Sequence, residues 1–425
     1  MARRRVWRDL RSSLPALIAG FTVVIAFLAV LGIMLAAAGP EGLGLSERRT
    51  SGWIAVVYGL PMIPALILTL RYRIPLPFTG NLFAIIFFVS LGRRVSFPEL
   101  SGATIVAGAI VLGTAVVGVA GHLARWIPGP IVQGLIAGAV MPFVIDLFTS
   151  LSASGGRWRL PLVVASALVA YVGAQRVLGP RLPPILPAFV AGVLAAALTG
   201  SLGAFPTTFA APGLEVIGPV FSWEAILTVT PVLVALMTVQ ANIPSVIYLR
   251  AQGFDPPGRV VDVVSGVGTM AGSLFGPVAL SLALPPLLVT AGPGAGDRVL
   301  RYRSIYLPVV AGLVIAVFAG TAADLAVLLP PALLLAVAGL ALLPALGAAL
   351  REIVSGPLVV GPLFAFAIAL SDMTVFGLGP FFWSLVIGTL VSLVLERDGW
   401  RQLRADASTA AEREARRTAL DASGR

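Results

Sequence analysis

The sequence predicts an all-α membrane protein with 14 transmembrane spans, built as 7+7 inverted repeats with core and gate domains. Its composition is 58% hydrophobic and only 11% charged, with a mean hydropathy of +0.98, values typical of a multi-span membrane protein. Apolar stretches long enough to cross a hydrocarbon core of ~30 Å recur along the chain. Two of them, Pro75–Leu91 and Gly276–Ala291, are short and interrupted by proline and glycine at corresponding places in the two halves. Such pairs mark the binding site of secondary transporters.

The expected domain organisation begins with a cytoplasmic N-terminus at 1–13 and ends with a cytoplasmic tail at 397–425. The first repeat, 14–200, holds seven spans: Leu14–Ala38, Gly52–Leu70, the broken Pro75–Leu91, Pro98–Gly121, Pro128–Leu151, Leu160–Leu178 and Pro184–Leu198. An outer connecting loop, 201–222, leads to the second repeat, 223–396. Its spans are Trp223–Arg250, Arg259–Phe275, the broken Gly276–Ala291, Ile305–Gly320, Asp324–Leu350, Gly356–Ser371 and Phe376–Leu395. The first span is too long for a cleaved signal peptide.

The arginines orient the chain in the membrane. All 29 basic residues are arginine, and if both termini are cytoplasmic, 23 of them lie inside. The six left outside are Arg48, Arg49, Arg93, Arg94, Arg157 and Arg159. This asymmetry follows the positive-inside rule and predicts a multi-pass protein of the inner (plasma) membrane. The net charge of +10 is dispersed over many loops, so it indicates lipid contact and topology and no nucleic-acid partner.

A weak internal repeat supports the inverted topology. A shift of 202 positions aligns Pro75 with Pro277, Pro128 with Pro330 and Pro142 with Pro344. Chance would account for about one such match, so the repeat is a hypothesis at this stage. The same shift sets Thr79 and Gly80 opposite Ser281 and Leu282, which makes the two broken spans counterparts.

Each broken span is expected to be an extended arm followed by a half-helix. Pro75 and Pro77 favour extended backbone, and Thr79 or Asn81 can cap the helix after them. In the second arm, Ser281 is the expected cap of a half-helix that begins near Leu282. Helix N-termini bind anions, and because unpaired backbone is costly at this depth, we expect the two arms to hydrogen-bond to each other. Two kinked but otherwise ordinary helices are the plain alternative.

The eighth span carries two amides, Gln240 and Asn242, just before Pro244, which we expect to break the helix. A bilayer-buried amide needs a partner, so it faces the bundle interior. Contact with a substrate or an ion is one interpretation, and a structural hydrogen bond between helices is the other.

The chain resembles the benzoate/proton symporter family of aromatic-acid permeases, which share the seven-plus-seven fold with nucleobase and sulfate-type transporters. The resemblance covers most of the chain, and the motifs that carry it are Gln240–Pro244, Tyr248–Pro257, Phe275–Ala279, Trp126–Pro128 and Met141–Leu147. It implies a core domain of spans one to four and eight to eleven, moving against a gate domain of spans five to seven and twelve to fourteen, often in a dimer. It also implies that substrate meets Phe78, Thr79, Gly80, Asn81, Gln240, Asn242, Ser281 and Leu282.

The acids depart from the pattern of proton-coupled relatives. Nucleobase permeases carry acids on spans eight and ten, where this chain has amides, Ser281 and Leu282, which puts proton coupling in doubt. Asp146 and Asp262 lie deepest among the remaining acids and are the candidate proton-coupling residues. For Asp262, an ion pair with Arg259, three residues earlier, is the plain alternative.

An acid-free pocket of amides, hydroxyls and helix N-termini favours an anion, and Phe78, Phe83 and Phe275 suit an aromatic body. The predicted function is secondary transport of a small organic anion, most simply a benzoate-like carboxylate with proton symport. The alternatives are an inorganic-anion or nucleobase carrier of the same fold, or a passive anion channel. A membrane enzyme is disfavoured, since the chain has no cysteine, a single histidine, His122, and no clustered acids. No metal or cofactor is expected.

Overall fold

The computed structural model describes residues 2–39, 42–91, 94–118, 128–152, 158–177, 184–203, 211–371, 373–376 and 378–403. The first half forms α1 Ala2–Ala38, α2 Glu47–Gly59, α3 Met62–Tyr72, β1 Phe78–Gly80, α4 Leu82–Ser90, α5 Phe97–Val117, α7 Gly129–Ser152, α8 Arg159–Val177 and α9 Ile185–Leu198. His122, Arg93, Arg157, the Trp126–Ile127 part of one motif and the tail beyond residue 403 lie outside the described residues.

The second half opens with α10 Trp223–Ala235, the π-helix η3 Leu236–Asn242, α11 Ile243–Ala251 and α12 Gly258–Gly272. It continues with β2 Leu280–Leu282, α13 Leu284–Thr290, the 3₁₀ turns η4 Pro293–Ala295 and η5 Arg298–Ile305, α14 Tyr306–Val317, α15 Ala319–Leu328, α16 Pro331–Ser355, α17 Val360–Leu370 and α18 Pro380–Leu395. Among the described residues the named strands form a single two-stranded sheet, and the other regular elements are helices.

The protein is a multi-pass membrane protein. In the described part of the chain, eight helices are long and apolar enough to cross a bilayer, or nine if α18 and the helix Arg397–Leu403, bent by 102°, form one span. Two shorter apolar helices, α9 and α17, accompany them. Large apolar side chains such as Ile67, Val169 and Leu395 are exposed on the outside of the bundle, as expected of a surface that faces lipid.

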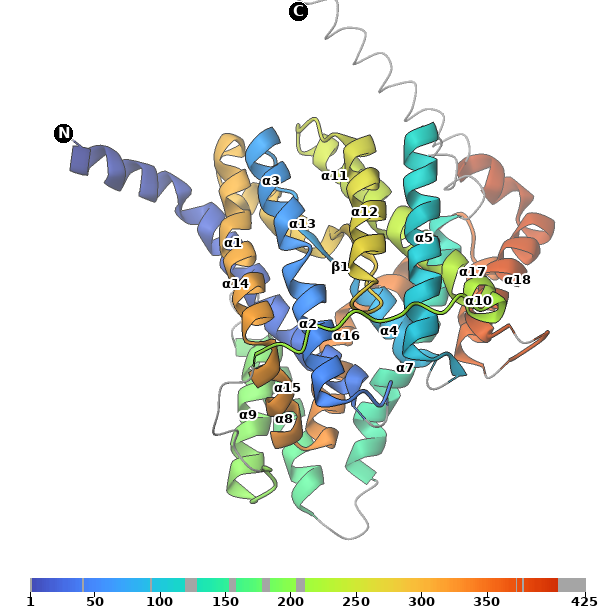
Figure 1. Cartoon of the computed structure of the whole chain (residues 1–425), viewed down its shortest axis with the longest axis horizontal. Helices are drawn as coiled ribbons and strands as arrows, with labels where there is room; N and C mark the ends of the chain where they lie inside the picture. Colours follow the sequence, from blue (N-terminus) through green and yellow to red (C-terminus); the bar gives the residue numbers. More distant parts are fainter. Residues whose placement is uncertain are drawn as a thin grey trace, which may run out of the picture.

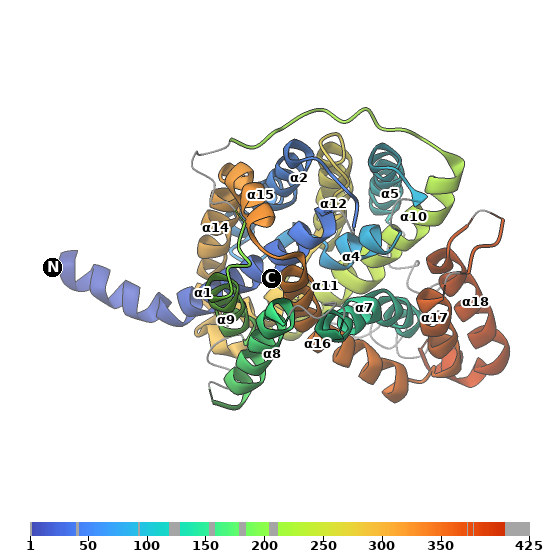
Figure 2. The same ribbon diagram turned by 90° about the horizontal axis from the view of Figure 1, so that it is seen from below.

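Two groups of helices pack around the sheet. In the first, α12 and α10 pack against α5, and α14 packs against α2, α3 and α1 (Figure 1). In the second, α7 packs against α16 and α17, α17 against α18, and α8 against α9 and α16 (Figure 2). The groups meet where α1 contacts α16 and where α7 contacts η3 and α4. The short sheet thus belongs to the first group and lies near the boundary with the second.

The eighth predicted span is one continuous helical segment, so the expected break at Pro244 is wrong. The chain passes from α10 through the π-helix η3 into α11, and the Ile243 N–H donates to the Thr238 carbonyl, five residues back. Pro244 has no N–H to donate to Gln240. The wider π turn accommodates this missing hydrogen bond without ending the helix.

The boundary between the predicted eleventh and twelfth spans is also wrong. We expected the twelfth span to begin at Asp324, but Asp324 lies within α15, which follows α14 closely. The break comes instead at Pro330, and α16 begins at Pro331. Two successive prolines remove two N–H donors, so a helix starts there far more easily than it continues through.

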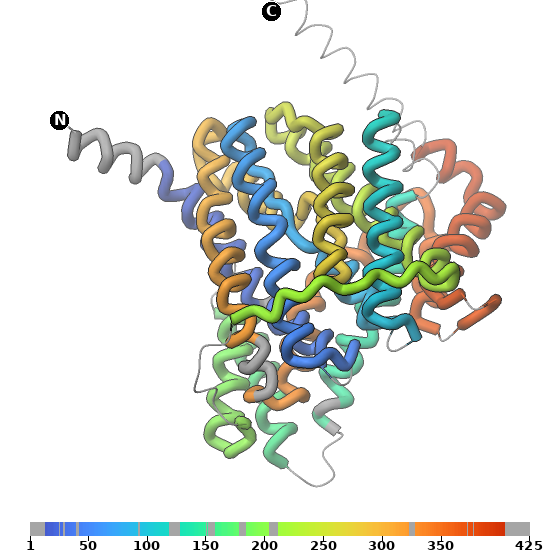
Figure 3. Tube along the Cα trace, viewed as in Figure 1, coloured from blue at the N-terminus to red at the C-terminus, as the bar shows by residue number. Residues whose placement is uncertain are grey.

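Residues 211–222 form an extended strap across the ends of α2, α12 and α5 before the chain enters α10 (Figures 2 and 3). The Ile217 N–H donates to the Leu274 carbonyl at 2.7 Å, and the Val220 N–H donates to the Pro98 carbonyl at 3.0 Å. The strap therefore shares backbone hydrogen bonds with the segments at the ends of two helices of the first group.

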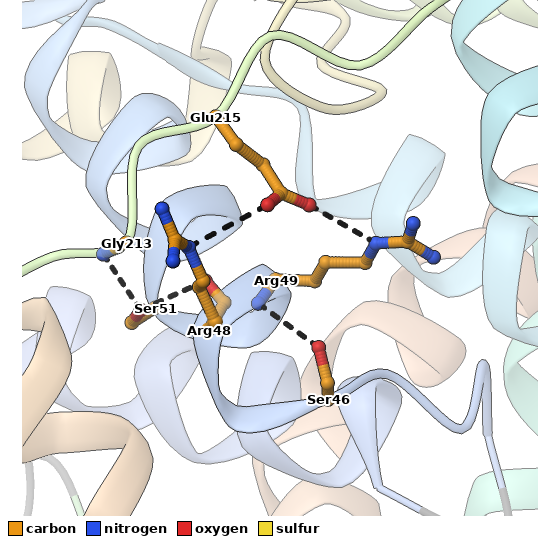
Figure 4. Close-up of polar contacts among 6 residues, drawn as sticks. All are labelled: Ser46, Arg48, Arg49, Ser51, Gly213 and Glu215. Carbon is orange, nitrogen blue, oxygen red and sulfur yellow. Dashed lines mark hydrogen bonds and ion pairs between the residues drawn. The ribbon is translucent and has the colours of Figure 1, made fainter.

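At α2 the strap is held by side chains (Figure 4). Glu215 lies between Arg48 and Arg49, with N–O distances of 3.5 and 3.2 Å, and the Gly213 N–H donates to the Ser51 hydroxyl at 3.0 Å. The ion pairs are largely exposed, so each contributes at most about 1 kcal/mol. The backbone of the strap at Gly213 also lies close against the backbone of Arg48 at the start of α2.

At α5 the strap makes a second close backbone approach, which a glycine permits and which allows a matched test. A Cβ at Gly102 would lie 2.2 Å from the Val220 carbonyl oxygen, whereas a Cβ at Gly113 on the same helix meets nothing within 4 Å. Gly102→Ala should therefore lower the melting temperature, although alanine favours helix over glycine by ~1 kcal/mol. Gly113→Ala should leave it unchanged or raise it. Equal melting temperatures for the two variants in thermal unfolding would contradict the strap contact.

Candidate functional site

The two extended arms form an antiparallel pair at the centre of the molecule. In this sheet Thr79 faces Ser281, Phe78 faces Leu282 and Gly80 faces Leu280. The Asn81 N–H donates to the Ala279 carbonyl at 2.7 Å, and the Ala283 N–H donates to the Pro77 carbonyl at 3.0 Å. These two bonds are related by the same 202-residue shift found in the sequence. The expected pairing of the arms is confirmed.

Side chains from neighbouring helices hold the remaining backbone groups of the arms. The Thr69 hydroxyl accepts from the Leu76 N–H at 3.2 Å, and the Thr269 hydroxyl accepts from the Leu280 N–H at 2.8 Å. The indole N–H of the fully buried Trp53 donates to the Pro277 carbonyl at 2.8 Å. Because water is absent from the bilayer core, such partners allow extended backbone at this depth.

Asn81 caps α4 and also ties three elements together. Its Oδ1 accepts from the N–H groups of Phe83 and Ala84 at 3.0 and 3.2 Å. Its Nδ2 donates to the Ser281 hydroxyl at 3.2 Å and to the Leu236 carbonyl of η3 at 3.3 Å. Both N–H groups of the amide are used, so Asn81 positions the site and has no donor left for a ligand.

The second half-helix starts differently from the expectation. α13 begins at Leu284 with Ala283 as its N-cap, and no side chain caps it. The predicted cap by Ser281 is wrong, because Ser281 lies within β2 with its hydroxyl bound to Asn81. The residues after Leu284 are Pro285 and Pro286, which have no N–H. The first turn of α13 therefore offers a single N–H, from Leu284, and lacks the donors that an anion-binding helix terminus needs.

Asn242 is committed to protein contacts on every side. Its Nδ2 donates to Asp262 Oδ1 at 2.9 Å and to the Ser265 hydroxyl at 3.0 Å, and its Oδ1 accepts from the Leu282 N–H at 2.9 Å. The Ser245 hydroxyl donates to the Leu282 carbonyl at 3.2 Å. Asn242 is 1% exposed. Its amide fixes β2 against η3 and α12.

Gln240, unlike Asn242, has a side-chain amide that the described residues of the protein do not use. It is half-buried in η3, and its side chain makes no hydrogen bond to any residue that the structure describes. Gln240 lies one helical turn after Leu236, whose carbonyl binds Asn81. Residues two apart in a helix point to nearly opposite sides, so Gln240 faces away from the α12 contacts of Asn242. π-helical turns occur frequently at functional sites, and this one was not predicted from the sequence, although Pro244 was a signal for it.

The remaining predicted site residues lie on two opposite faces of the β1–β2 ribbon. Directly opposed residues share a face of the ribbon, so Thr79 and Ser281 lie together on the face that Asn81 reaches. Phe78 and Leu282 belong to the other face and are fully buried. A Cβ at Gly80 would lie 2.7 Å from Val57 Cγ1, so Gly80 allows close packing on α2. We call Thr79, Asn81 and Ser281, together with Gln240 of the adjacent η3, the polar face.

The two candidate carboxylates lie in different surroundings. Asp262 accepts from Asn242 and does not pair with Arg259, whose guanidinium instead donates to the Val116 carbonyl at 2.9 Å. Asp146 is half-buried on α7, and among the described residues no hydrogen bond or ion pair of its side chain is found. Within the same residues no three histidine, cysteine or acidic side chains gather as a metal site would require.

The fold is shared with membrane anion transporters. The transmembrane domain of a cyanobacterial bicarbonate transporter, BicA, aligns with a TM-score of 0.54 and 16% identity over 90% of this chain and 97% of that one. Murine solute carrier 26 family member A9, an anion transporter in the inward-facing state, aligns with a TM-score of 0.58 and 12% identity over 90% and 68%. Together with the helical bundle and the paired arms, these likenesses define the fold of the chain as that of a multi-pass membrane protein.

Residues 11–394 match the BenE family, whose members are described as benzoate membrane transport proteins. The chain belongs to this family, and the resemblance inferred from its sequence is confirmed. The benzoate membrane transport protein of Acinetobacter baylyi is 26% identical over 388 residues, covering 90% of this chain and 95% of that protein. The inner membrane protein YdcO of Escherichia coli is 26% identical over 385 residues, covering 90% and 96%.

The positioning role of Asn242 leads to a stability prediction. Asn242→Ala leaves the Leu282 N–H, the Ser265 hydroxyl and the Asp262 carboxylate without this partner, and each buried unsatisfied group costs about 1–3 kcal/mol. We expect a clear drop in melting temperature and loss of transport together. Ser265→Ala, which removes a single partner, should cause a smaller drop. Wild-type stability of Asn242→Ala would show that the amide is not a structural tie.

Proposed function

We propose that the chain carries a benzoate-like aromatic carboxylate across the inner membrane by alternating access, and that the polar face binds the carboxylate. Family membership and the name of the Acinetobacter relative support this substrate class. The observation that carries the proposal is the half-buried amide of Gln240, which has no partner among the described residues and lies one helical turn after Leu236, whose carbonyl binds Asn81. A half-buried amide without a protein partner is costly, and a ligand carboxylate would satisfy it.

The polar face has the chemistry of an anion site. Thr79 and Ser281 can each donate an O–H, and Gln240 can donate two N–H groups. α4 adds the positive end of its dipole. The one carboxylate bonded within this network, Asp262, lies behind Asn242. Phe83 is half-buried in the first turn of α4 and suits an aromatic ring, whereas Phe78 is fully buried on the opposite face of the ribbon.

The same proposal includes fourteen spans in two inverted repeats of seven. The 202-residue shift takes the first residues of β1, α4 and α7, which are Phe78, Leu82 and Gly129, onto those of β2, α13 and α16, which are Leu280, Leu284 and Pro331. The antiparallel pairing of Thr79 with Ser281 is the arrangement that a two-fold axis in the membrane plane would produce. The broken third and tenth spans are then β1 with α4 and β2 with α13.

Movement of a core domain against a gate domain is the mechanism we infer. The group around α5 and α12 corresponds to the predicted core, spans one to four and eight to eleven, and the group around α7 and α16 to the predicted gate, spans five to seven and twelve to fourteen. Backbones within the gate group are close enough that a Cβ at Gly134 would lie 2.2 Å from the Pro362 carbonyl oxygen. Tight packing inside each group favours motion of each as a unit. The polar face lies near the boundary, where α7 contacts η3 and α4.

The orientation follows from the arginine distribution. We propose that both termini are cytoplasmic and that 201–222, which contains the strap, is outside, with the protein working as a homodimer. Cysteine accessibility at position 215, on a chain that has no native cysteine, tests the side of the strap. Light scattering of the purified protein measures its molar mass, and a protein mass of twice the 43.9 kDa of one chain would support the dimer.

Transport itself is tested by uptake of labelled benzoate into proteoliposomes. Uptake should saturate, and an inward proton gradient should increase it if transport is proton symport. Sulfate and bicarbonate serve as competitors, because the fold is shared with inorganic-anion carriers. Competition by these ions without benzoate uptake would move the substrate to the inorganic class, and flux that does not saturate would indicate a channel.

The same assay separates the two coupling candidates. We infer that Asp146 is the better proton carrier, because its half-buried carboxylate has no described partner while Asp262 is held by Asn242. Asp146→Asn should abolish the gradient stimulation and leave counterflow of benzoate intact, and Asp262→Asn should reduce stability instead. Gradient stimulation retained in Asp146→Asn would contradict this assignment.

Gln240 provides the sharpest test of the site. A hydrogen bond to a charged group contributes about 1.5–3 kcal/mol, so Gln240→Ala should weaken benzoate affinity roughly ten- to hundredfold at unchanged melting temperature. Gln175→Ala on α8 is the matched control, since Gln175 is exposed and its amide bonds only to Tyr171 among the described residues. Unchanged affinity in Gln240→Ala, or a stability loss as large as that of Asn242→Ala, would refute the contact.

A further inference from the structure

A basic and aromatic cluster lies where α3 ends beside the start of α14. Arg71, Tyr72 and Arg73 close α3, and Tyr302 and Tyr306 come from η5 and α14. The helices α3 and α14 pack side by side (Figure 1). We call these five residues the α3–η5 cluster. It contains two guanidinium groups and three phenols and takes no part in the polar face.

Both guanidinium groups lie over tyrosine rings. The guanidinium carbon of Arg71 lies 5.6 Å from the ring centre of Tyr72, and that of Arg73 lies 6.0 Å from the ring centre of Tyr302. The Tyr302 and Tyr306 rings meet edge to face at 6.0 Å. A cation–π contact does not use the N–H groups of a guanidinium as hydrogen-bond donors to protein oxygens, so they stay available. Within the described residues neither Arg71 nor Arg73 donates a hydrogen bond or forms an ion pair.

The surface next to the cluster is apolar and exposed. On α3, Ile63, Ile67 and Leu70 are 54, 58 and 50% exposed, and their spacing puts them on one face of the helix. On α14, Val310 and Val314 are 58 and 50% exposed. In a membrane protein these faces meet acyl chains. The α3–η5 cluster therefore lies at the end of a lipid-facing surface, where tyrosine and arginine side chains sit at headgroup level.

We propose that the α3–η5 cluster binds the phosphate of an anionic phospholipid whose acyl chains lie along α3 and α14. The in-plane N–H groups of a guanidinium match a phosphate diester, and the tyrosine hydroxyls add donors at the same depth. Charge complementarity favours an anionic lipid over a zwitterionic one. Because α3 leads directly into the first arm, bound lipid would also steady the segment that carries Thr79.

The test is lipid-dependent thermal stability of the purified full-length protein in detergent. Phosphatidylglycerol should raise the melting temperature more than phosphatidylcholine at equal concentration, and Arg71→Gln with Arg73→Gln should remove at least half of that difference. Arg176→Gln with Arg351→Gln is the control, since both arginines are exposed and the charge change is equal. The control should keep the full difference.

Three outcomes would overturn the proposal: an equal lipid effect in the Arg71 and Arg73 double variant, an equal loss in the control, or the same stabilisation by inorganic phosphate alone, which would indicate a free-phosphate site. If the double variant does not fold, Arg73→Lys gives the answer. This change keeps the charge but not the planar donor groups, and it should reduce the phosphatidylglycerol effect, whereas an undiminished effect would contradict phosphate binding.

Discussion

The pairing of two short extended arms inside a helical membrane protein is the constraint on which the rest of the site depends. Extended backbone exposes its N–H and C=O groups, and a bilayer core has no water to satisfy them. The arms pair with each other around Thr79 and Ser281. Their outer groups are taken up by Thr69, Thr269 and Trp53. The polar residues in this region are therefore first of all partners for backbone.

This requirement sorts the amides of the site by function. Asn81 and Asn242 both spend their N–H groups on protein, one at the start of α4 and the other behind β2. Gln240 lies on η3 two residues before Asn242 and therefore points to the other side of the helix. The π turn lies directly before Pro244, so this helical irregularity coincides with Gln240, whose amide has no partner among the described residues.

The site of this chain differs from an anion site built on the N-termini of two helices. α4 keeps its helix terminus, with Asn81 as cap, but Pro285 and Pro286 remove donors from the first turn of α13. An anion at the polar face would then be bound mainly by side chains. The fold that this chain shares with a bicarbonate transporter consequently says little about its substrate, whose recognition we propose to depend on the hydroxyls, the Gln240 amide and Phe83.

Much of this protein follows from its sequence alone. Hydropathy and arginine placement predict a multi-pass membrane protein, prolines at 75, 77 and 277 predict extended arms, and the motifs around Gln240 and Phe275 identify the family. These are local signals, since proline geometry and apolar length act within a few residues. Tertiary structure decided what depends on contacts between distant segments: that Ser281 binds Asn81 instead of capping α13, that Asn242 is enclosed while Gln240 is not, and that Phe78 is buried away from Thr79. A hydrogen-bond partner 40 or 200 residues away leaves no trace in the local pattern, so only the folded chain shows which polar groups remain for a ligand.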